Sequence, residues 1–338
     1  MPPQAIGRSQ FALSAMLSVV AFCVAVVALT WGVERARSVL WLFVFYGAAT
    51  VLSYLVPSAI GDAVTRLEFM ALPMVVLALS LSAARRHPRG LVVAAVALAA
   101  WLNVPPLASS FVAGVRTSAS DASYWQPAVT FLRARQSPSY RVEAVDTVGH
   151  WPALHLARAG IPLARGWFRQ DDFPQNAVLY GSVTPAAYVA WLRRMAVRYV
   201  VLPDASLDYT AHAEAAVLRG GRTPLRVVLR ARHLTIFEVP DPRPIVTGPG
   251  RARVLSLTQG GAVLDLPRAG TYRVAIRYTP YWRVTDGCAR EARDGMTRLT
   301  VPRAGRVRLV FSWSPERALD VVAGRPASDC PRHYRSGS

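Results

Sequence analysis

The densest group of side chains suited to ligand binding lies between Arg165 and Asp172. The stretch contains an indole and a guanidinium, Trp167 and Arg169, followed by two adjacent carboxylates, Asp171 and Asp172. An aromatic ring beside charged hydrogen-bonding groups is typical of a sugar-binding surface, and paired aspartates also suit a divalent cation. A structured loop in which the arginines and aspartates pair with each other explains the same residues equally well, so both interpretations stay open.

A second group of ionisable residues, Asp62, Arg66 and Glu68, lies between two apolar segments. A guanidinium at a membrane boundary can hold a lipid phosphate, which makes Arg66 a candidate ligand-binding residue. The alternative, an arginine neutralised by the two flanking acids, is the favoured interpretation. A lone histidine such as His150 is more typical of an ordinary loop than of a ligand set.

Short motifs that identify a nucleophile or a metal site are missing from the sequence. It contains no His-Glu-x-x-His, no Gly-x-Ser-x-Gly and no Cys-x-x-Cys. We therefore predict no metal and no cofactor, and we assign no catalytic residue. Whether the chain is an enzyme stays open at this stage.

The three cysteines fall into two environments. Cys23 lies in an apolar run, whereas Cys288 and Cys330 lie in the polar part of the chain. Paired cysteines outside the cytoplasm tend to be oxidised. We expect a disulfide between Cys288 and Cys330, which would close a loop of about 40 residues and stabilise a small module by roughly 3–4 kcal/mol. Two unpaired thiols are the alternative.

The polar residues described above follow or interrupt four apolar segments. The length of each segment is close to the roughly 20 residues that a helix needs to cross a bilayer. The segments cover about residues 11–32, 39–56, 67–84 and 90–113 of a transmembrane region over residues 1–116. The third is the weakest, because Glu68 stands at its start and Pro73 interrupts it.

Arginines in short loops favour the cytoplasmic side of a membrane. Two arginines lie in loop 34–38 and three in loop 85–89, so we place both loops in the cytoplasm. The N-terminus and everything beyond about residue 116 then lie outside. This predicts a multi-pass plasma-membrane protein with an extracytoplasmic C-terminal domain. An external N-terminus of about ten residues also leads us to expect the C-terminal portion of a longer protein.

Charge is segregated along the 338 residues, which carry 39 basic and 20 acidic side chains and a net charge of +19. Residues 1–113 contain seven arginines and three acids, which leaves 32 basic and 17 acidic residues for the remainder. A hydrophobic content of 52% excludes a disordered chain. Because the positive charge is spread along the outer part rather than gathered in one stripe, we predict no nucleic-acid partner.

The outer part has two compositional halves. Alternating helix and strand patterns predict an α/β domain over residues 117–240, in which Thr184 and Pro185 suit the N-cap and the first position of a helix. Short strand patterns separated by Gly, Pro and Asp turns then predict a β-rich, sandwich-like module over residues 241–338.

Four motif strings carry a family resemblance: Pro57–Glu68, Arg165–Asp172, Met195–Asp204 and Tyr278–Trp282. In this order they resemble a group of actinobacterial polytopic membrane proteins that look distantly like C-type glycosyltransferases, which use polyprenyl-phosphate sugar donors. The resemblance covers nearly all of this chain but only the last part of those longer proteins. It implies a bacterial cell-envelope protein whose partners are the lipid bilayer and a polyprenyl-phosphate sugar or a cell-wall glycan.

In C-type glycosyltransferases the catalytic acid lies in the first external loop, and nothing before Phe11 could supply it here. The resemblance therefore implies a glycosyltransferase-like membrane protein that lacks the N-terminal catalytic segment. The alternative is a non-enzymatic structural or scaffold protein whose external module binds a glycan or a protein partner.

Overall fold

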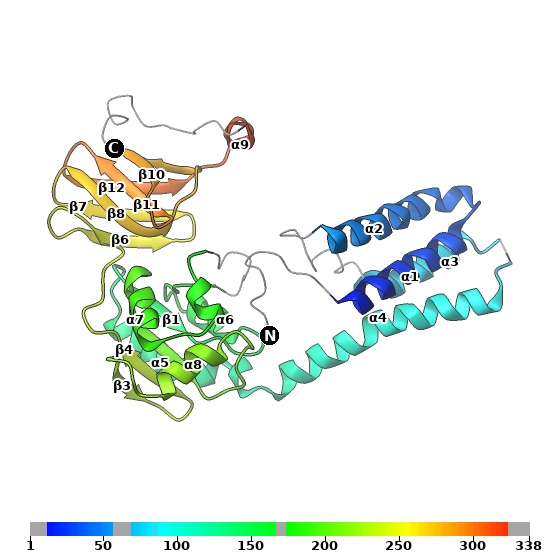
Figure 1. The fold of residues 1–338 in the computed structure, drawn as a ribbon, viewed down its shortest axis with the longest axis horizontal. Coiled ribbons are helices and arrows are strands. Elements are labelled where there is room, and N and C mark those ends of the chain that lie inside the picture. Colours follow the sequence, from blue (N-terminus) through cyan, green and yellow to red (C-terminus); the bar gives the residue numbers. More distant parts are fainter. Residues whose placement is uncertain (1–11, 57–68, 85, 167–173, 324–338) are drawn as a thin grey trace. The chain divides into compact units, whose positions relative to one another are not determined.

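The structure, a computed structural model, describes residues 12–56, 69–84, 86–166 and 174–323. The chain divides into two compact units, residues 1–116 and residues 117–338. The first unit is helical, and the second combines an α/β domain with a β module (Figure 1).

Three helices of the first unit are long and apolar enough to cross a membrane. They are α1 (Leu13–Thr30), α2 (Arg37–Leu55) and α4 (Arg89–Arg116). With 18 residues, α1 extends over about 27 Å, close to the roughly 30 Å of hydrocarbon in a bilayer. A helix satisfies its own backbone hydrogen bonds, so these apolar runs need no polar face.

The expected fourth span corresponds to the shorter helix α3 (Ala71–Leu81), which has 11 residues. A helix of that length covers roughly 16 Å, about half of the hydrocarbon core, so the described residues do not confirm a fourth crossing. Residues 67 and 68, where that segment was expected to begin, lie outside the described residues. Pro73 lies in the first turn of α3, where its missing N–H breaks no helical hydrogen bond, and therefore does not interrupt the helix.

The helices of the first unit share an apolar core. Phe22 of α1 and Phe43 of α2 meet edge to face in it, with ring centroids 5.6 Å apart. Asn103 of α4 accepts a hydrogen bond from the backbone N–H of Leu72 at 3.0 Å, which satisfies one donor at the start of α3. Outward-facing apolar side chains such as Trp101, 67% exposed, form the surface that a lipid-facing bundle requires.

The α/β domain is built on one four-stranded sheet of order β1-β2-β4-β3. Strands β1 and β2 are parallel, and β4 is antiparallel to both β2 and β3. The strands are β1 (Arg141–Ala144), β2 (Val197–Pro203), β3 (Arg226–Arg230) and β4 (Leu234–Glu238). The helices are α5 (Ala122–Arg135), α6 (Trp151–Arg158), α7 (Pro185–Arg194) and α8 (His212–Arg219).

Helices cover both faces of this sheet, which explains why the central strand β2 is apolar along most of its length. Helices α7 and α8 bury Trp191 and Leu218 against one face, and α5 and α6 bury Trp125 and Leu156 against the other. The Thr184 hydroxyl caps α7 by accepting a backbone N–H at 3.2 Å, as the sequence predicted.

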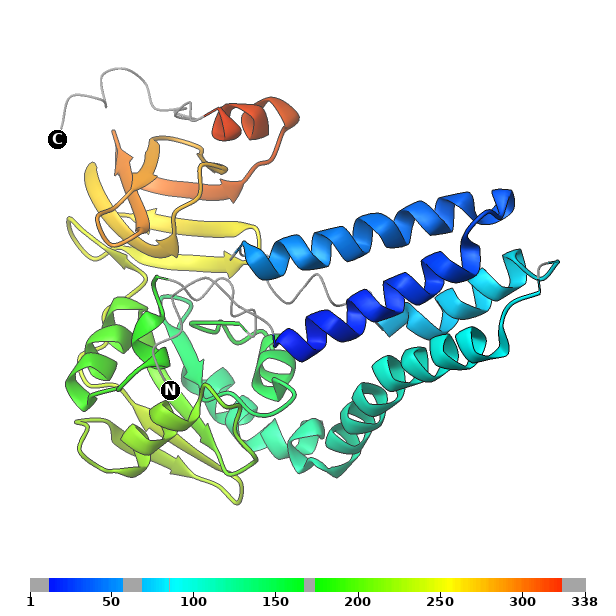
Figure 2. The same ribbon diagram turned by 45° about the vertical axis from the view of Figure 1, so that its right-hand side comes forward.

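The β module consists of two four-stranded antiparallel sheets, β10-β11-β8-β5 and β6-β7-β12-β9 (Figure 2). The two sheets share one core, in which Leu264 and Val307 of one sheet pack with Tyr272 and Leu299 of the other. The β-rich character that the strand patterns predicted is therefore confirmed. The elements are β5 (Val246–Thr247), β6 (Arg253–Thr258), β7 (Gly261–Leu266), β8 (Gly270–Arg277), β9 (Trp282–Val284), β10 (Cys288–Glu291), β11 (Met296–Val301), β12 (Gly305–Phe311) and the helix α9 (Pro315–Val322).

A network of four buried side chains lies inside the α/β domain. Arg165 donates from Nε to Glu143 at 2.7 Å and from Nη2 to Glu214 at 2.6 Å. The Tyr188 hydroxyl donates to Glu214 at 2.6 Å. Side-chain exposure is 7% for Arg165, 0% for Glu143 and 1% for Glu214. The network joins β1, α7, α8 and the segment after α6.

Removing the cation of this network should destabilise the domain strongly. Arg165→Met leaves two buried carboxylates without their counter-charge, and we expect it to lower the free energy of unfolding by about 3–5 kcal/mol. Urea unfolding of the full chain in detergent micelles, followed by tryptophan fluorescence, measures this loss. The control is Arg158→Met, at an exposed position of α6, which should change stability by less than about 0.5 kcal/mol. Equal losses in the two variants would contradict the expectation.

Candidate functional site

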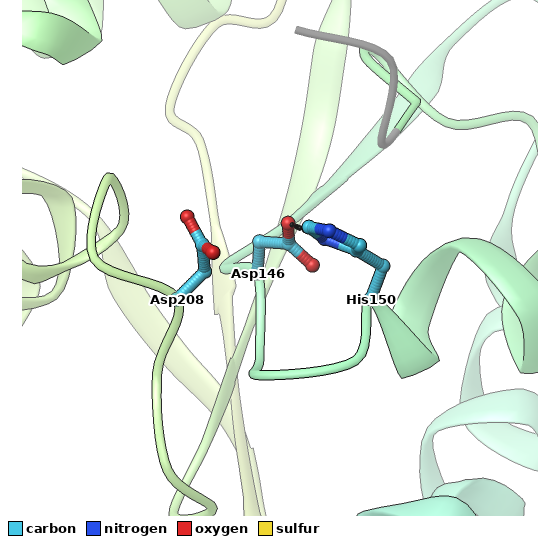
Figure 3. Close-up of side chains that lie close together, drawn as sticks. All are labelled: Asp146, His150 and Asp208. Atoms are coloured by element: carbon cyan, nitrogen blue, oxygen red, sulfur yellow. Dashed lines mark hydrogen bonds and ion pairs between the residues drawn. The ribbon is translucent and has the colours of Figure 1, made fainter. Parts of the chain in front are cut away.

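Asp146, His150 and Asp208 come together at one edge of the α/β sheet (Figure 3). Asp146 follows the last residue of β1 by two positions, and Asp208 follows the last residue of β2 by five. Because β1 and β2 are parallel neighbours, their carboxyl ends lie at the same edge. In open α/β sheets, ligands bind at this edge.

The three side chains form a compact group of nitrogen and oxygen donors. Asp146 Oδ2 lies 2.6 Å from His150 Nδ1, and one ligand atom from each of the three residues lies within 4.8 Å of the other two. The backbone N–H of Asp208 donates to the carbonyl of Asp146 at 3.1 Å. The two loops that carry the group are therefore tied together through their backbones.

Local hydrogen bonds orient both carboxylates. Asp146 Oδ1 accepts the backbone N–H of Thr147 at 3.0 Å, while its other oxygen contacts the imidazole. Asp208 Oδ1 accepts from the N–H and the hydroxyl of Thr210 at 3.0 and 2.6 Å. Asp208 is buried, whereas 30% of the His150 side chain is exposed. Solvent therefore reaches the group at its histidine.

His150 has a left-handed backbone conformation, with φ 57° and ψ 35°. It follows Gly149, at φ 85°, where a Cβ would lie 2.8 Å from the indole nitrogen of Trp151. For a residue other than glycine this conformation costs roughly 1–2 kcal/mol. Strain of this kind persists where the surrounding structure requires it, and it clusters at functional sites. Here the left-handed backbone conformation of His150 places its imidazole next to the Asp146 carboxylate.

This donor set suits a divalent metal ion. Zn²⁺ and Mn²⁺ accept imidazole nitrogen and carboxylate oxygen, and adjacent ligands around such an ion lie about 3.0–3.4 Å apart. The Asp146–His150 pair also suits acid–base chemistry, because a carboxylate at Nδ1 fixes the tautomer in which Nε2 accepts a proton. The partial exposure of His150 is compatible with both uses.

A second polar cluster directly after β2 has a different character. Asp204 accepts a hydrogen bond from the Tyr124 hydroxyl at 2.7 Å and lies 2.9 Å from His233 Nδ1. Partial burial works against ionisation of Asp204, but these two contacts outweigh it and lower the pKa of this carboxyl below its usual value. Burial, followed by the contact with Asp204, raises the pKa of Tyr124. The cluster is thus a fixed tie between α5, β2 and the turn between β3 and β4.

The ligand residues suggested by the sequence lie outside the described residues. These are Arg66, Trp167, Arg169, Asp171 and Asp172, together with Cys330. The ligand surface and the Cys288–Cys330 disulfide stay predictions, and Cys288 itself is buried at the start of β10. Arg165, which the sequence grouped with the loop, is instead buried and paired with Glu143 and Glu214, so it is not part of an exposed sugar-binding surface.

Sequence reasoning missed the group formed by Asp146, His150 and Asp208. It treated His150 as an ordinary loop residue and expected no metal, because the spacing matches no standard metal motif. The available signal was the Asp-x-x-x-His string after one strand and an aspartate after another. That signal becomes informative only once the two strands are known to be parallel neighbours.

Comparison of the chain with protein-family models, with curated protein sequences and with solved structures finds no match in any of the three. The structure alone therefore defines the class of protein. It is a helical unit with three helices apolar enough to span a membrane, joined to an α/β domain and a two-sheet β module.

Substitutions at His150 should separate backbone strain from the role of the imidazole. His150→Gly and His150→Ala both remove the contact with Asp146, but glycine adopts the left-handed conformation freely. We expect the glycine variant to unfold with a free energy roughly 1 kcal/mol higher than the alanine variant. The matched pair is His212→Gly and His212→Ala, at an exposed position of α8, where alanine should be the more stable. Urea unfolding measures the stability of all four variants. If His150→Ala is more stable than His150→Gly, the backbone at position 150 is not strained.

Proposed function

We propose that the chain is a membrane-anchored protein whose α/β domain binds a divalent transition-metal ion through Asp146, His150 and Asp208. The observation behind the proposal is the convergence of three ligand atoms within 4.8 Å at the carboxyl ends of two parallel strands. The Asp146–His150 separation of 2.6 Å is slightly shorter than that of adjacent metal ligands, so a small side-chain rotation admits an ion.

The mixture of donors favours Zn²⁺ or Mn²⁺ over Ca²⁺ and Mg²⁺, which prefer oxygen ligands alone. Three protein ligands leave at least one coordination position for water or a substrate, as in catalytic metal sites. An ion held by Asp146, His150 and Asp208 would supply Lewis-acid chemistry, which polarises a phosphoryl or carbonyl oxygen or lowers the pKa of a bound water.

The membrane part of the proposal is a four-span arrangement in the plasma membrane of a bacterial cell envelope, with residues 117–338 outside the cytoplasm. Helices α1, α2 and α4 support three crossings by length and composition, and α3 is the proposed fourth. Arg35, between α1 and α2, Arg37, the first residue of α2, and the arginines of residues 85–89 favour cytoplasmic loops at those positions.

The relation to glycosyltransferase-like envelope proteins belongs to the same proposal and is supported by the order of the motif strings in the sequence. Its partners would be a polyprenyl-phosphate sugar or a cell-wall glycan. The alternative is a non-enzymatic scaffold, and the two differ in the role of the metal. In a scaffold the ion only stabilises the domain, whereas in an enzyme its removal abolishes turnover of a lipid-linked sugar while the domain stays folded.

Metal binding can be measured by isothermal titration of the full chain in detergent micelles with MnCl₂ or ZnCl₂. Asp146→Asn and Asp208→Asn should each weaken binding by more than about 100-fold, because each removes an anionic ligand. Binding should also be weaker at pH 5.5 than at pH 7.5, since an imidazole ligand must be deprotonated.

The control for this titration is Asp241→Asn, which makes the same chemical change at an exposed position before β5. It should bind as tightly as the wild type. If neither metal binds the wild-type chain, or if all three asparagine variants bind alike, the proposed site is wrong.

Membrane topology can be measured with alkaline phosphatase fusions after His87 and after Val200. Phosphatase is active only outside the cytoplasm. We expect an inactive fusion at His87, between α3 and α4, and an active fusion at Val200 in β2. An active enzyme at His87, or an inactive one at Val200, would exclude the proposed orientation.

A further inference from the structure

A groove of about 520 Å³ lies on the outer face of the sheet β6-β7-β12-β9 of the β module. Its size falls within the range of ligand-binding sites. Neighbouring strands of this one face supply its lining residues, which are Leu255 and Ser256 of β6, Val263 of β7, Thr285 directly after β9, and Arg306 and Arg308 of β12. Four of these six residues are exposed, so the groove is open to solvent.

A β-bulge in β6 shapes one side of the groove. Val254 pairs with Leu264 of β7, and both side chains lie in the core. The next pair joins Ser256 to Val263, so Leu255 is an extra residue without a partner on β7. Such a bulge changes the direction in which side chains point. Here Leu255, 41% exposed, and Ser256 both lie at the outer face, which gives the groove an aliphatic side chain beside a hydroxyl.

Strand β12 contributes two arginines to the groove. Val307 packs in the core, so its neighbours Arg306 and Arg308 lie on the outer face, as the two-residue period of a strand requires. Across the sheet, Arg308 is paired with Val263 on one side. On the other side its backbone N–H donates to the Thr285 hydroxyl oxygen at 3.1 Å. Neither of these neighbours carries a negative charge.

The charge of this face is positive. Asp265 is the single acidic residue in its four strands, and it lies between Arg306 and Arg253 in the strand register. Among the residues that the structure describes, no ion pair involves Arg306 or Arg308. Residues 246–311 contain twelve arginines and four acidic residues, an excess of eight positive charges. Residues 167–173 and 324–338 contain four arginines and three aspartates, so they do not offset this excess.

We infer that the groove binds an acidic glycan, a sugar chain that carries carboxylate groups, through Arg306 and Arg308. The planar fork of a guanidinium matches the two oxygens of a carboxylate, and such contacts are among the strongest hydrogen bonds in proteins. The Ser256 and Thr285 hydroxyls are suited to hydrogen bonds with sugar hydroxyls. The exposed side chain of Leu255 is suited to contact with the ring carbons.

The composition of the groove favours this ligand over a neutral sugar or a peptide. No aromatic side chain is among its described lining residues, so charge rather than ring stacking must supply the affinity. An extended peptide adds to the edge of a sheet through its backbone, whereas β7 and β12 are inner strands with a neighbour on each side. The inference rests on the glycan partner in the proposed function and assigns its chemical class. It involves none of the proposed metal ligands.

The test is isothermal titration of the full chain in detergent micelles with trigalacturonate, a trimer of a uronic acid. EDTA keeps the metal site empty, and maltotriose is the neutral trimer for comparison. Trigalacturonate should bind the wild type, and Arg306→Gln and Arg308→Gln should each weaken binding by about tenfold, because each removes a charged hydrogen-bond donor. Added sodium chloride should weaken binding too. Arg293→Gln makes the same charge change at an exposed turn of the other sheet and should bind as the wild type does.

Two measurements separate a lost binding group from a damaged fold. Arg306 and Arg308 are exposed, so their glutamine variants should unfold at the temperature of the wild type. Arg308→Lys keeps the charge and should retain part of the affinity. The inference is overturned if trigalacturonate does not bind the wild type, or if Arg308→Gln binds it as tightly as Arg293→Gln. Equal binding of maltotriose would overturn the acidic class of the ligand but leave the glycan partner of the proposed function intact.

Competition tests the other anionic partners. If phosphatidylglycerol in mixed micelles displaces trigalacturonate and phosphatidylcholine does not, the face binds an anionic membrane surface and the inference is wrong. If triglutamate binds as tightly as trigalacturonate, the groove is a site for an acidic peptide, and the inference is again wrong. Binding of trigalacturonate that neither competitor matches supports the acidic glycan.

Discussion

The ion pairs of Arg165 with Glu143 and Glu214 are the constraint on which the α/β domain depends. Charges removed from water are unfavourable unless each is paired at close range, so β1, α8 and the segment after α6 must keep a fixed spacing. Glu143 lies three residues before Asp146, and Glu214 lies six residues after Asp208. The geometry that satisfies the buried network therefore also limits the distance between the two loops that hold the candidate metal ligands.

The sheet supplies the second constraint. Val142 of β1 packs into the core under α5 and α6, whereas its neighbour Glu143 points to the network under α7 and α8. This alternation follows from the two-residue period of a strand. The strand then ends, and the chain turns through the left-handed pair Gly149 and His150. A buried charge, a strand end and a strained turn within eight residues direct the imidazole to the sheet edge.

Arginine serves a structural purpose in many parts of the second unit. The guanidinium of Arg133 donates twice to the carbonyl of Ala159, and that of Arg193 donates twice to the carbonyl of Pro240. A planar group with several donors satisfies such carbonyls well. These two arginines therefore close the end of α6 and the junction before the β module. Arg141 is used in the same way, because its guanidinium donates to the carbonyls of Met195 and Ala275.

The sequence by itself determined the features that depend on a few neighbouring residues. Apolar runs without charge predicted α1, α2 and α4, and the Thr184 cap predicted the start of α7, because helix formation is local. Only the tertiary structure decided the candidate site, since the parallel pairing of β1 with β2 joins segments more than 50 residues apart. Arg165 resembled a surface residue for the same reason: the two glutamates that neutralise it come from a distant strand and a distant helix, which a local pattern does not reveal.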